Sequence, residues 1–278
     1  MAQLQDTLIS GSIKLPTTED TSSAGNIWFD EVAQRAKYSY YGGVWSAGGA
    51  LSSARYAAAG AGEQNAGLAF GGSSPSPSAN LAEEYNGSSW SAGGAMITCR
   101  YSLAGAGTQN AGLAFGGNGP SRVSCTEEYD GSSWSAGGAL STARYRLAGA
   151  GTQNAGLAFG GSNPSIVPDT EEYNGSSWSA GGALSTARDR FAGAGTQNAG
   201  LAFGGRLSSP SYAIVSCTEE YDGSSWSTGG ALSTIRCELA GTGEQNAGLT
   251  FGGKPGNDIL SCTEEYNFGI QPTNLGER

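Results

Sequence analysis

The sequence contains no histidine and few charged residues, and both shortages narrow the possible functions. None of the 278 residues is His, and Asp and Glu number 24 against 14 Lys and Arg. Without imidazole the commonest general base and metal ligand is missing, and no phosphate loop or thiolate metal spacing occurs. A net charge of −10 without a basic cluster argues against nucleic acid as a partner. We therefore expect no enzyme, no catalytic residues, no cofactor and no metal site.

Long apolar runs are also missing. No window approaches the roughly 18–20 apolar residues that a membrane-spanning helix needs, so we expect no membrane insertion. The first ten residues, MAQLQDTLIS, have neither a basic leader nor an apolar run. On that composition the sequence predicts no secretory signal.

The sequence is instead rich in glycine and in repeated text. GTQNAGLAFGG occupies residues 107–117 and returns unchanged at 151–161 and 195–205. A tryptophan recurs at spacings of 45, 44, 44 and 48 residues, and the phenylalanine before each Gly-Gly keeps the same spacings. A period of about 40–50 residues is typical of a propeller blade or a solenoid unit. The tryptophans are Trp45, Trp90, Trp134, Trp178 and Trp226.

One period divides into four short strands, a to d. Paired glycines end strand b and free the chain to turn. Asn174-Gly175 begins the hairpin between strands c and d, whose loop could have two or four residues. The four-residue loop places Tyr173 directly opposite Trp178, and we favour it for that reason. In the third copy the strands are expected at 144–151, 155–161, 170–173 and 176–182, with Leu147, Leu157, Phe159, Tyr173 and Trp178 in the core.

The two ends of the repeated region indicate how the blades close. The first repeat is incomplete and contains only a strand d (40–49). The last repeat is also incomplete and contains only strands a to c, ending at 261–268. Two incomplete blades make one complete blade if they meet, and closure removes two exposed strand edges. The sequence therefore predicts an all-β fold. It is a five-bladed β-propeller of four-stranded antiparallel blades, closed by the N-terminal strand d pairing with the C-terminal strand c.

The order of motifs within a period resembles the kelch repeat. A double glycine, a tyrosine followed by an acid or amide, a tryptophan and then an arginine recur over about residues 38–268. In the third copy these are Gly160-Gly161, Tyr173-Asn174, Trp178 and Arg188.

A second resemblance concerns residues 10–45. Their Gly-Asn-Ile-Trp-Phe-Asp strand, Lys-Tyr and Gly-x-x-Trp are similar to short hairpin modules of bacteriophage tail-fibre and other virion proteins. Together with the near-identical kelch-like repeats, this implies a cyanophage-type virion protein. We expect an N-terminal arm (1–25) that docks on the virion, a propeller (26–268) that includes the hairpin 26–49, and a tail (269–278).

The resemblances imply a function and partners. We expect a non-enzymatic virion protein, assembled in the host cytoplasm as part of a tail fibre or the capsid, that recognises a host-surface glycan or protein. One alternative is a purely structural or decorating virion component, and another is a lectin-like or protein-interaction scaffold. The expected partners are other virion proteins and the host-surface ligand, and a homo-oligomer is left open.

The repeated side chains allow a structural and a functional interpretation. The tryptophans can pack between blades or stack on sugars, and the arginines can pair with the repeated glutamates or bind anions. The Gln-Asn turns can satisfy the backbone or bind sugar hydroxyls. We favour the structural interpretation each time. Cysteines 125, 217 and 262 share one repeat position, and all five cysteines are expected to be unpaired apolar fillers.

The loops between strands b and c vary from repeat to repeat in both length and sequence. Their lengths are 10, 9, 9, 13 and 10 residues in a chain that otherwise copies itself. They should share one face with the d–a loops, and loops on a rigid scaffold commonly carry recognition. The alternative is neutral drift in surface loops. The contacts that we expect to discriminate ligands are Arg122, Asp169, Arg206, Tyr212, Lys254 and Asp258.

Overall fold

The computed structural model describes residues 27–30, 35–38, 47–73 and 80–267. The chain divides into two compact units, Met1–Ala47 and Gly48–Arg278. In the first unit β1 (Ile27–Asp30) pairs antiparallel with β2 (Arg35–Tyr38). This hairpin lies within the segment in which the sequence predicts one. The predicted arm (1–25) and tail (269–278) lie outside the described residues.

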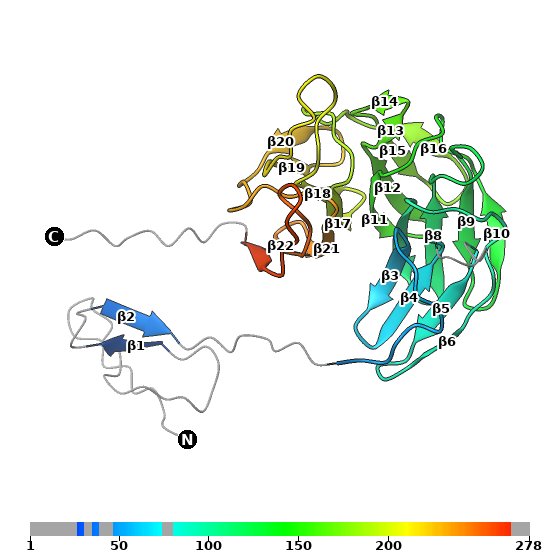
Figure 1. The fold of residues 1–278 in the computed structure, drawn as a ribbon, viewed down its shortest axis with the longest axis horizontal. Coiled ribbons are helices and arrows are strands. Elements are labelled where there is room, and N and C mark those ends of the chain that lie inside the picture. Colours follow the sequence, from blue (N-terminus) through cyan, green and yellow to red (C-terminus); the bar gives the residue numbers. More distant parts are fainter. Residues whose placement is uncertain (1–26, 31–34, 39–46, 74–79, 268–278) are drawn as a thin grey trace. The chain divides into compact units, whose positions relative to one another are not determined.

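The second unit is built from strands that pair in sequence order (Figure 1). The first blade is β3 (Ala59–Glu63), β4 (Ala66–Phe70), β5 (Ala82–Tyr85) and β6 (Trp90–Ala92). The second is β7 (Ala104–Thr108), β8 (Ala111–Phe115), β9 (Thr126–Tyr129) and β10 (Trp134–Gly137). The third is β11 (Ala148–Thr152), β12 (Ala155–Phe159), β15 (Thr170–Tyr173) and β16 (Trp178–Ala180).

Two more blades and a small hairpin complete the described strands. The fourth blade is β17 (Ala192–Thr196), β18 (Ala199–Phe203), β19 (Thr218–Tyr221) and β20 (Trp226–Thr228). Of the fifth blade, β21 (Ala240–Glu244), β22 (Ala247–Phe251) and β23 (Thr263–Asn267) are described. Within the third b–c loop, β13 (Ser162–Asn163) pairs with β14 (Ser165–Ile166).

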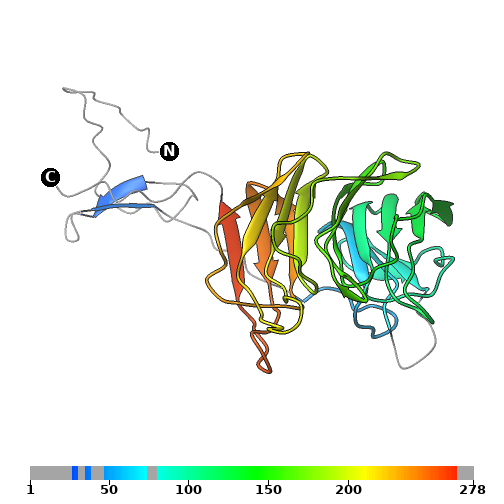
Figure 2. The same cartoon turned by 90° about the horizontal axis from the view of Figure 1, so that it is seen from above.

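The blades follow one another around the propeller (Figures 1 and 2), with strand a of each innermost (Figure 1). Strand β3 neighbours β7, β7 neighbours β11, β11 neighbours β17, and β17 neighbours β21. The predicted fold class is confirmed: an all-β, five-bladed propeller of antiparallel blades, four of them four-stranded and the fifth with three strands in the described part of the chain. The strand that the sequence assigns to close the fifth blade spans 40–49, of which 40–46 lie outside the described residues.

Strand a begins later than the sequence predicts. We expected it at Arg144, but β11 begins at Ala148 because Arg146 has a left-handed backbone (φ 57°) that interrupts the extended chain. The Arg146 N–H donates to the Ser102 carbonyl at 2.8 Å, so the irregular residue links two blades. The equivalent left-handed residues are Ala57, Ser102, Arg146, Arg190 and Glu238, and each of the last four donates to the one before it.

The c–d hairpin has the four-residue loop that we favoured. Tyr173 pairs with Trp178 across β15 and β16, and their ring centroids lie 4.9 Å apart. Asn174 Oδ1 accepts the backbone N–H of Ser176 at 3.0 Å and of Ser177 at 2.9 Å. Aspartates at the equivalent positions make the same bonds. Asp and Asn therefore interchange because the turn needs a side-chain oxygen, not a charge.

Tryptophan packs between blades, as the structural interpretation predicts. The Trp178 ring of the third blade lies 4.9 Å from the Phe115 ring of the second, and its Nε1–H donates to Thr126 Oγ1 at 2.8 Å. Trp226 repeats both contacts one blade later, with Phe159 and Thr170. These indoles are held by the core and are not free to stack on a sugar.

Each blade also contains an Arg–Glu ion pair, buried in the first four blades and partly exposed at Glu264 in the fifth, which confirms the predicted Arg–Glu pairing. The Arg144 side chain is 0% exposed. Its Nη2 lies 2.9 Å from Glu171 Oε1, and its Nη1 donates to the carbonyls of Gly160 and Asp169. Burial lowers the pKa of Arg144, and the charge of Glu171 opposes that shift. The five pairs are Arg55–Glu83, Arg100–Glu127, Arg144–Glu171, Arg188–Glu219 and Arg236–Glu264.

The cysteines are unpaired as expected, but three of them are more than apolar fillers. All five are free. Cys217 Sγ accepts from Arg188 Nη1 at 2.7 Å, and Cys125 Sγ accepts from Arg100 Nη1 at 3.2 Å. Cys262 does the same for the arginine of the fifth blade. The repeated cysteine position thus lies against the buried guanidinium, which has more donors than one glutamate can satisfy.

Two further repeated contacts join neighbouring blades. Gln153 Nε2 donates to the carbonyls of Gly112 and Tyr129 in the preceding blade, at 3.1 and 2.7 Å. This confirms the structural interpretation of the Gln-Asn turns. The Tyr173 hydroxyl donates to Glu128 Oε1 at 2.5 Å. Burial, and then this hydrogen bond, raise the pKa of Tyr173 to about 12.

Candidate functional site

The residues that vary between repeats gather on one face of the propeller. The first residue after each Gly-Gly bridges to the residue that follows each repeat arginine, so the b–c and d–a loops meet there, as expected. We call this region the rim. It consists of the bridged pairs Tyr56–Ser73, Tyr101–Asn118, Tyr145–Ser162, Asp189–Arg206 and Cys237–Lys254, with the left-handed residues Ala57, Ser102, Arg146, Arg190 and Glu238.

Charged side chains of the rim form two clusters. The Asp189 side chain is fully buried and binds Arg206 through Nε at 3.2 Å and Nη2 at 3.1 Å. Glu238 binds Arg190 and, at 2.7 Å, Lys254. Partial burial opposes ionisation of Glu238, but its bonds to Lys254 and Arg190 prevail and lower its pKa. Both carboxylates are therefore already neutralised by rim cations.

Four of the six predicted contact residues lie at the rim or against it. Arg206 and Lys254 belong to it, and the Arg206 guanidinium carbon lies 5.7 Å from the centroid of the exposed Tyr212 ring. Arg122 bridges to Asn118 and lies 5.3 Å from the Tyr145 ring. The structure thus brings these residues into one region, although their role in ligand recognition remains a prediction.

The other two predicted residues are not among the residues that define the rim. Asp169 is exposed, and its carbonyl accepts from Arg144 and from the Gly160 N–H. Asp258 is exposed in the fifth b–c loop, beside Ile259, which is 87% exposed. For Asp169 the backbone contact is architectural.

Sequence reasoning missed several rim residues. Arg146, Arg190, Tyr145 and Glu238 lie in the stretch that we read as the start of strand a. A signal was present: the two residues after each repeat arginine read Tyr-Ala, Tyr-Ser, Tyr-Arg, Asp-Arg and Cys-Glu while the text around them repeats. A varying pair inside a repeated strand indicates a position that lies outside the regular strand.

The rim contains an open pocket between the second and third blades, of about 360 Å³. That volume is in the range of small-molecule sites. Two aromatic rings, two guanidinium groups, an amide and a hydroxyl border it. Its lining residues are Tyr101, Asn118, Ser121, Arg122, Tyr145 and Arg146.

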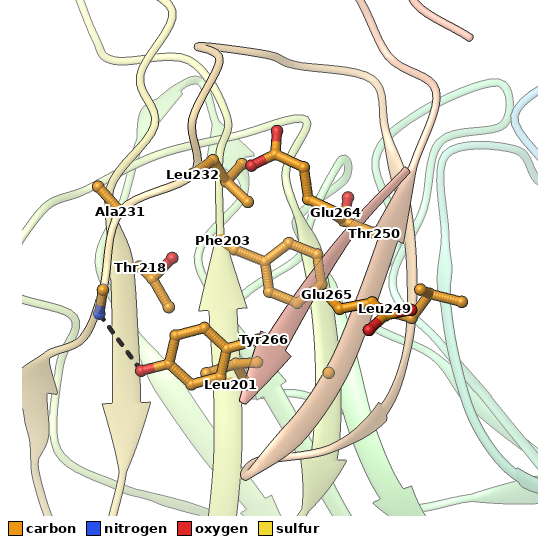
Figure 3. A pocket seen from close by; sticks show the side chains of 12 residues that line it. Leu201, Phe203, Thr218, Ala231, Leu232, Leu249, Thr250, Glu264, Glu265 and Tyr266 are labelled. Atoms are coloured by element: carbon orange, nitrogen blue, oxygen red, sulfur yellow. Dashed lines mark hydrogen bonds between the residues drawn. The ribbon is translucent and has the colours of Figure 1, made fainter. Parts of the chain in front are cut away.

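A second cavity, of about 50 Å³, lies between the fourth and fifth blades (Figure 3). Phe203, Thr218 and Tyr266 border it. They are equivalent to the residues that surround the Trp178 and Trp226 indoles at earlier interfaces. Thr218 Oγ1 is buried without a hydrogen-bond partner in the described part of the chain. The cavity therefore has the lining of an indole slot of the core, not of a ligand site.

Comparison with known proteins adds no family to this description. The chain matches no protein-family model, and it matches no curated protein. Among the described residues no helix is long and apolar enough to cross a membrane.

Proposed function

We propose that this protein is a non-enzymatic binding protein of a bacteriophage virion, in a tail fibre or associated with the capsid. Its propeller is a rigid scaffold, and the rim with its loops recognises a glycan or protein on the host surface. The virion assignment depends on the resemblance of the repeats and of residues 10–45 to virion proteins.

The contrast between interior and rim supports the proposal. Inside the blades, equivalent positions make equivalent bonds: each repeat arginine pairs with its glutamate. On the rim, the equivalent positions hold Ala57, Ser102, Arg146, Arg190 and Glu238. Because the interior positions repeat almost unchanged while the rim positions vary, each blade presents a different chemical surface on this face. Such a face suits recognition.

The fourth blade offers a direct test, because it can be rewritten as a copy of the third. In this rim variant, residues 206–218 are replaced by a copy of residues 162–170, which removes Arg206. The variant also carries Asp189→Tyr, because the Asp189 carboxylate would otherwise lose its ion-pair partner Arg206. The matched control changes the opposite face at the exposed Thr152 and Thr196, each to Ala. Both variants and the full chain are applied to an array of neutral and acidic glycans and to purified host envelope.

We expect the full chain and the control to bind the same glycan or envelope preparation. Binding should be lost in the rim variant if the ligand contacts the fourth blade, or in Arg122→Gln and Arg146→Gln if it contacts the rim between the second and third blades. Each variant should unfold at the same temperature as the control. If nothing on the array or in the envelope binds, or if the rim variant, Arg122→Gln and Arg146→Gln all bind as well as the full chain, the proposal fails. A purely structural or decorating virion component would then be the better assignment. Cleavage of any array glycan would overturn the non-enzymatic assignment.

A further inference from the structure

The rim pocket between the second and third blades holds two guanidinium groups against one ring. The Arg122 guanidinium carbon lies 5.3 Å from the Tyr145 centroid, and that of Arg146 lies 4.6 Å from it. Arg146 Nη1 also donates to the Tyr145 hydroxyl at 3.3 Å. Cation–π contacts stabilise each group individually, but two like charges so near each other repel. The arrangement is therefore poised to accept an anion.

Neither guanidinium has a carboxylate of its own in the described part of the chain. The nearest acid to Arg146 is Asp189, at 3.9 Å, and Arg206 already binds both oxygens of that carboxylate at 3.1–3.2 Å. Arg122 is exposed and has no ion-pair partner among the described residues. This unneutralised positive charge occurs in a chain of net charge −10, so it is a local feature and not a consequence of basic composition.

The next interface along the rim provides an internal comparison. Between the third and fourth blades, Ile166 takes the place of Arg122, and Asp189 takes the place of Tyr145. There the acid is bound by Ser162 Oγ at 3.0 Å and by Arg206. That interface neutralises its own charge, whereas the pocket at the second and third blades leaves its two arginines open to solvent.

The remaining lining groups suit a polyhydroxylated ligand. Asn118 Nδ2 donates to the Tyr101 hydroxyl at 2.6 Å, which orients the amide and leaves its carbonyl oxygen available as an acceptor. Ser121 contributes an exposed hydroxyl, and the two tyrosine rings provide flat apolar surfaces. Aromatic rings with a few fixed polar groups bind sugars, and paired guanidiniums bind carboxylate or sulfate through two parallel hydrogen bonds.

We propose that this pocket binds an acidic saccharide, with Arg122 and Arg146 holding its carboxylate or sulfate and Asn118, Ser121 and the tyrosine rings holding the sugar. The inference rests on the recognition function proposed above and names the ligand class for one of its sites. It applies to a carboxylated and to a sulfated sugar, because both present the same bidentate oxygens to a guanidinium.

Isothermal titration of the full chain tests it with three probes: an oligogalacturonate, a sulfated galactan oligosaccharide, and a neutral galacto-oligosaccharide of equal length. The variants are Arg122→Gln and Arg146→Gln. The charge-matched control is Lys37→Gln in β2, which removes one positive charge from the other compact unit of the chain.

We expect at least one acidic probe to bind more than tenfold tighter than the neutral one, and the affinity to fall as NaCl rises from 50 to 500 mM. Arg122→Gln and Arg146→Gln should each weaken binding about tenfold or more, and Lys37→Gln by less than twofold. Comparing the uronate with the sulfated probe identifies the acid group that fits.

Equal affinity for the neutral probe, or equal loss in the Lys37→Gln control, would overturn the inference. If a neutral glycan binds tightly and the rim variant of the fourth blade abolishes that binding, the pocket assignment fails while the proposed function stands. If no glycan binds but host envelope protein does, the pocket assignment likewise fails alone.

Discussion

The cavity between the fourth and fifth blades gives a sharp test of how the propeller is completed. At the two preceding interfaces an indole fills this position and donates to a threonine, at 2.8 Å to Thr126 and 2.9 Å to Thr170. The sequence predicts that residues 40–49 supply the last strand of the fifth blade. In that case Trp45, which lies outside the described residues, would be the donor to Thr218.

The perturbation is Thr218→Val, with Thr170→Val as the reference. Valine keeps the shape of threonine but removes the hydroxyl. At Thr170 the change leaves the buried Trp226 N–H without an acceptor, which costs about 1–3 kcal/mol. If an indole donates to Thr218, the cost there is the same. If nothing donates to it, Val replaces a buried unsatisfied hydroxyl, and the change is neutral or stabilising by about 1 kcal/mol.

Urea unfolding followed by tryptophan fluorescence measures the difference in the free energy of unfolding between these variants, and calorimetry measures the difference in Tm. We expect Thr218→Val to destabilise by about as much as Thr170→Val, which for a domain of this size lowers Tm by roughly 2–6 °C. We also expect Trp45→Phe to be non-additive with Thr218→Val, since both remove the same bond. A stabilising Thr218→Val, or full additivity with Trp45→Phe, would refute the assignment of Trp45 to this slot.

Two further predictions concern the repeated interior. Glu171→Ala removes the partner of the buried Arg144 and should lower the free energy of unfolding, measured in urea, by about 3–5 kcal/mol. Replacing both residues by Leu should lower it clearly less. Equal losses in the two variants would contradict a buried charge at Arg144. The pKa of Tyr173 is raised to about 12, so the folded state keeps a proton that the unfolded chain releases near pH 10. Its contribution to stability is complete below pH 10 and is lost as pH rises to 12. Tyr173→Phe should therefore show a shallower loss of stability over that range than the parent chain, and an unchanged slope would argue against the shift.

The repeated positions were predictable because each has the same structural role in every blade. Tyr173 opposite Trp178 follows from strand alternation and a four-residue turn, and the Arg144–Glu171 pair follows from their common period. The rim could not be read in the same way. The residue type of Arg146 does not mark a left-handed backbone, as glycine would. Its signal is the variation of the two residues after each repeat arginine, and without that comparison the sequence predicts that strand a begins at Arg144. The contact between Arg122 and Tyr145 joins two blades, and spacing within one repeat says nothing about side chains that meet across an interface.

The central claim is that ligand recognition is confined to the rim, over a scaffold whose opposite face is architectural. Amide hydrogen exchange of the full chain, with and without a saturating array glycan that it binds, tests this most directly. The account predicts slower exchange at residues 101–102, 118–122 and 145–146, and no change at the Gln-Asn and Asn-Gly turns of the opposite face. Slower exchange at those turns, with the rim unchanged, would contradict it.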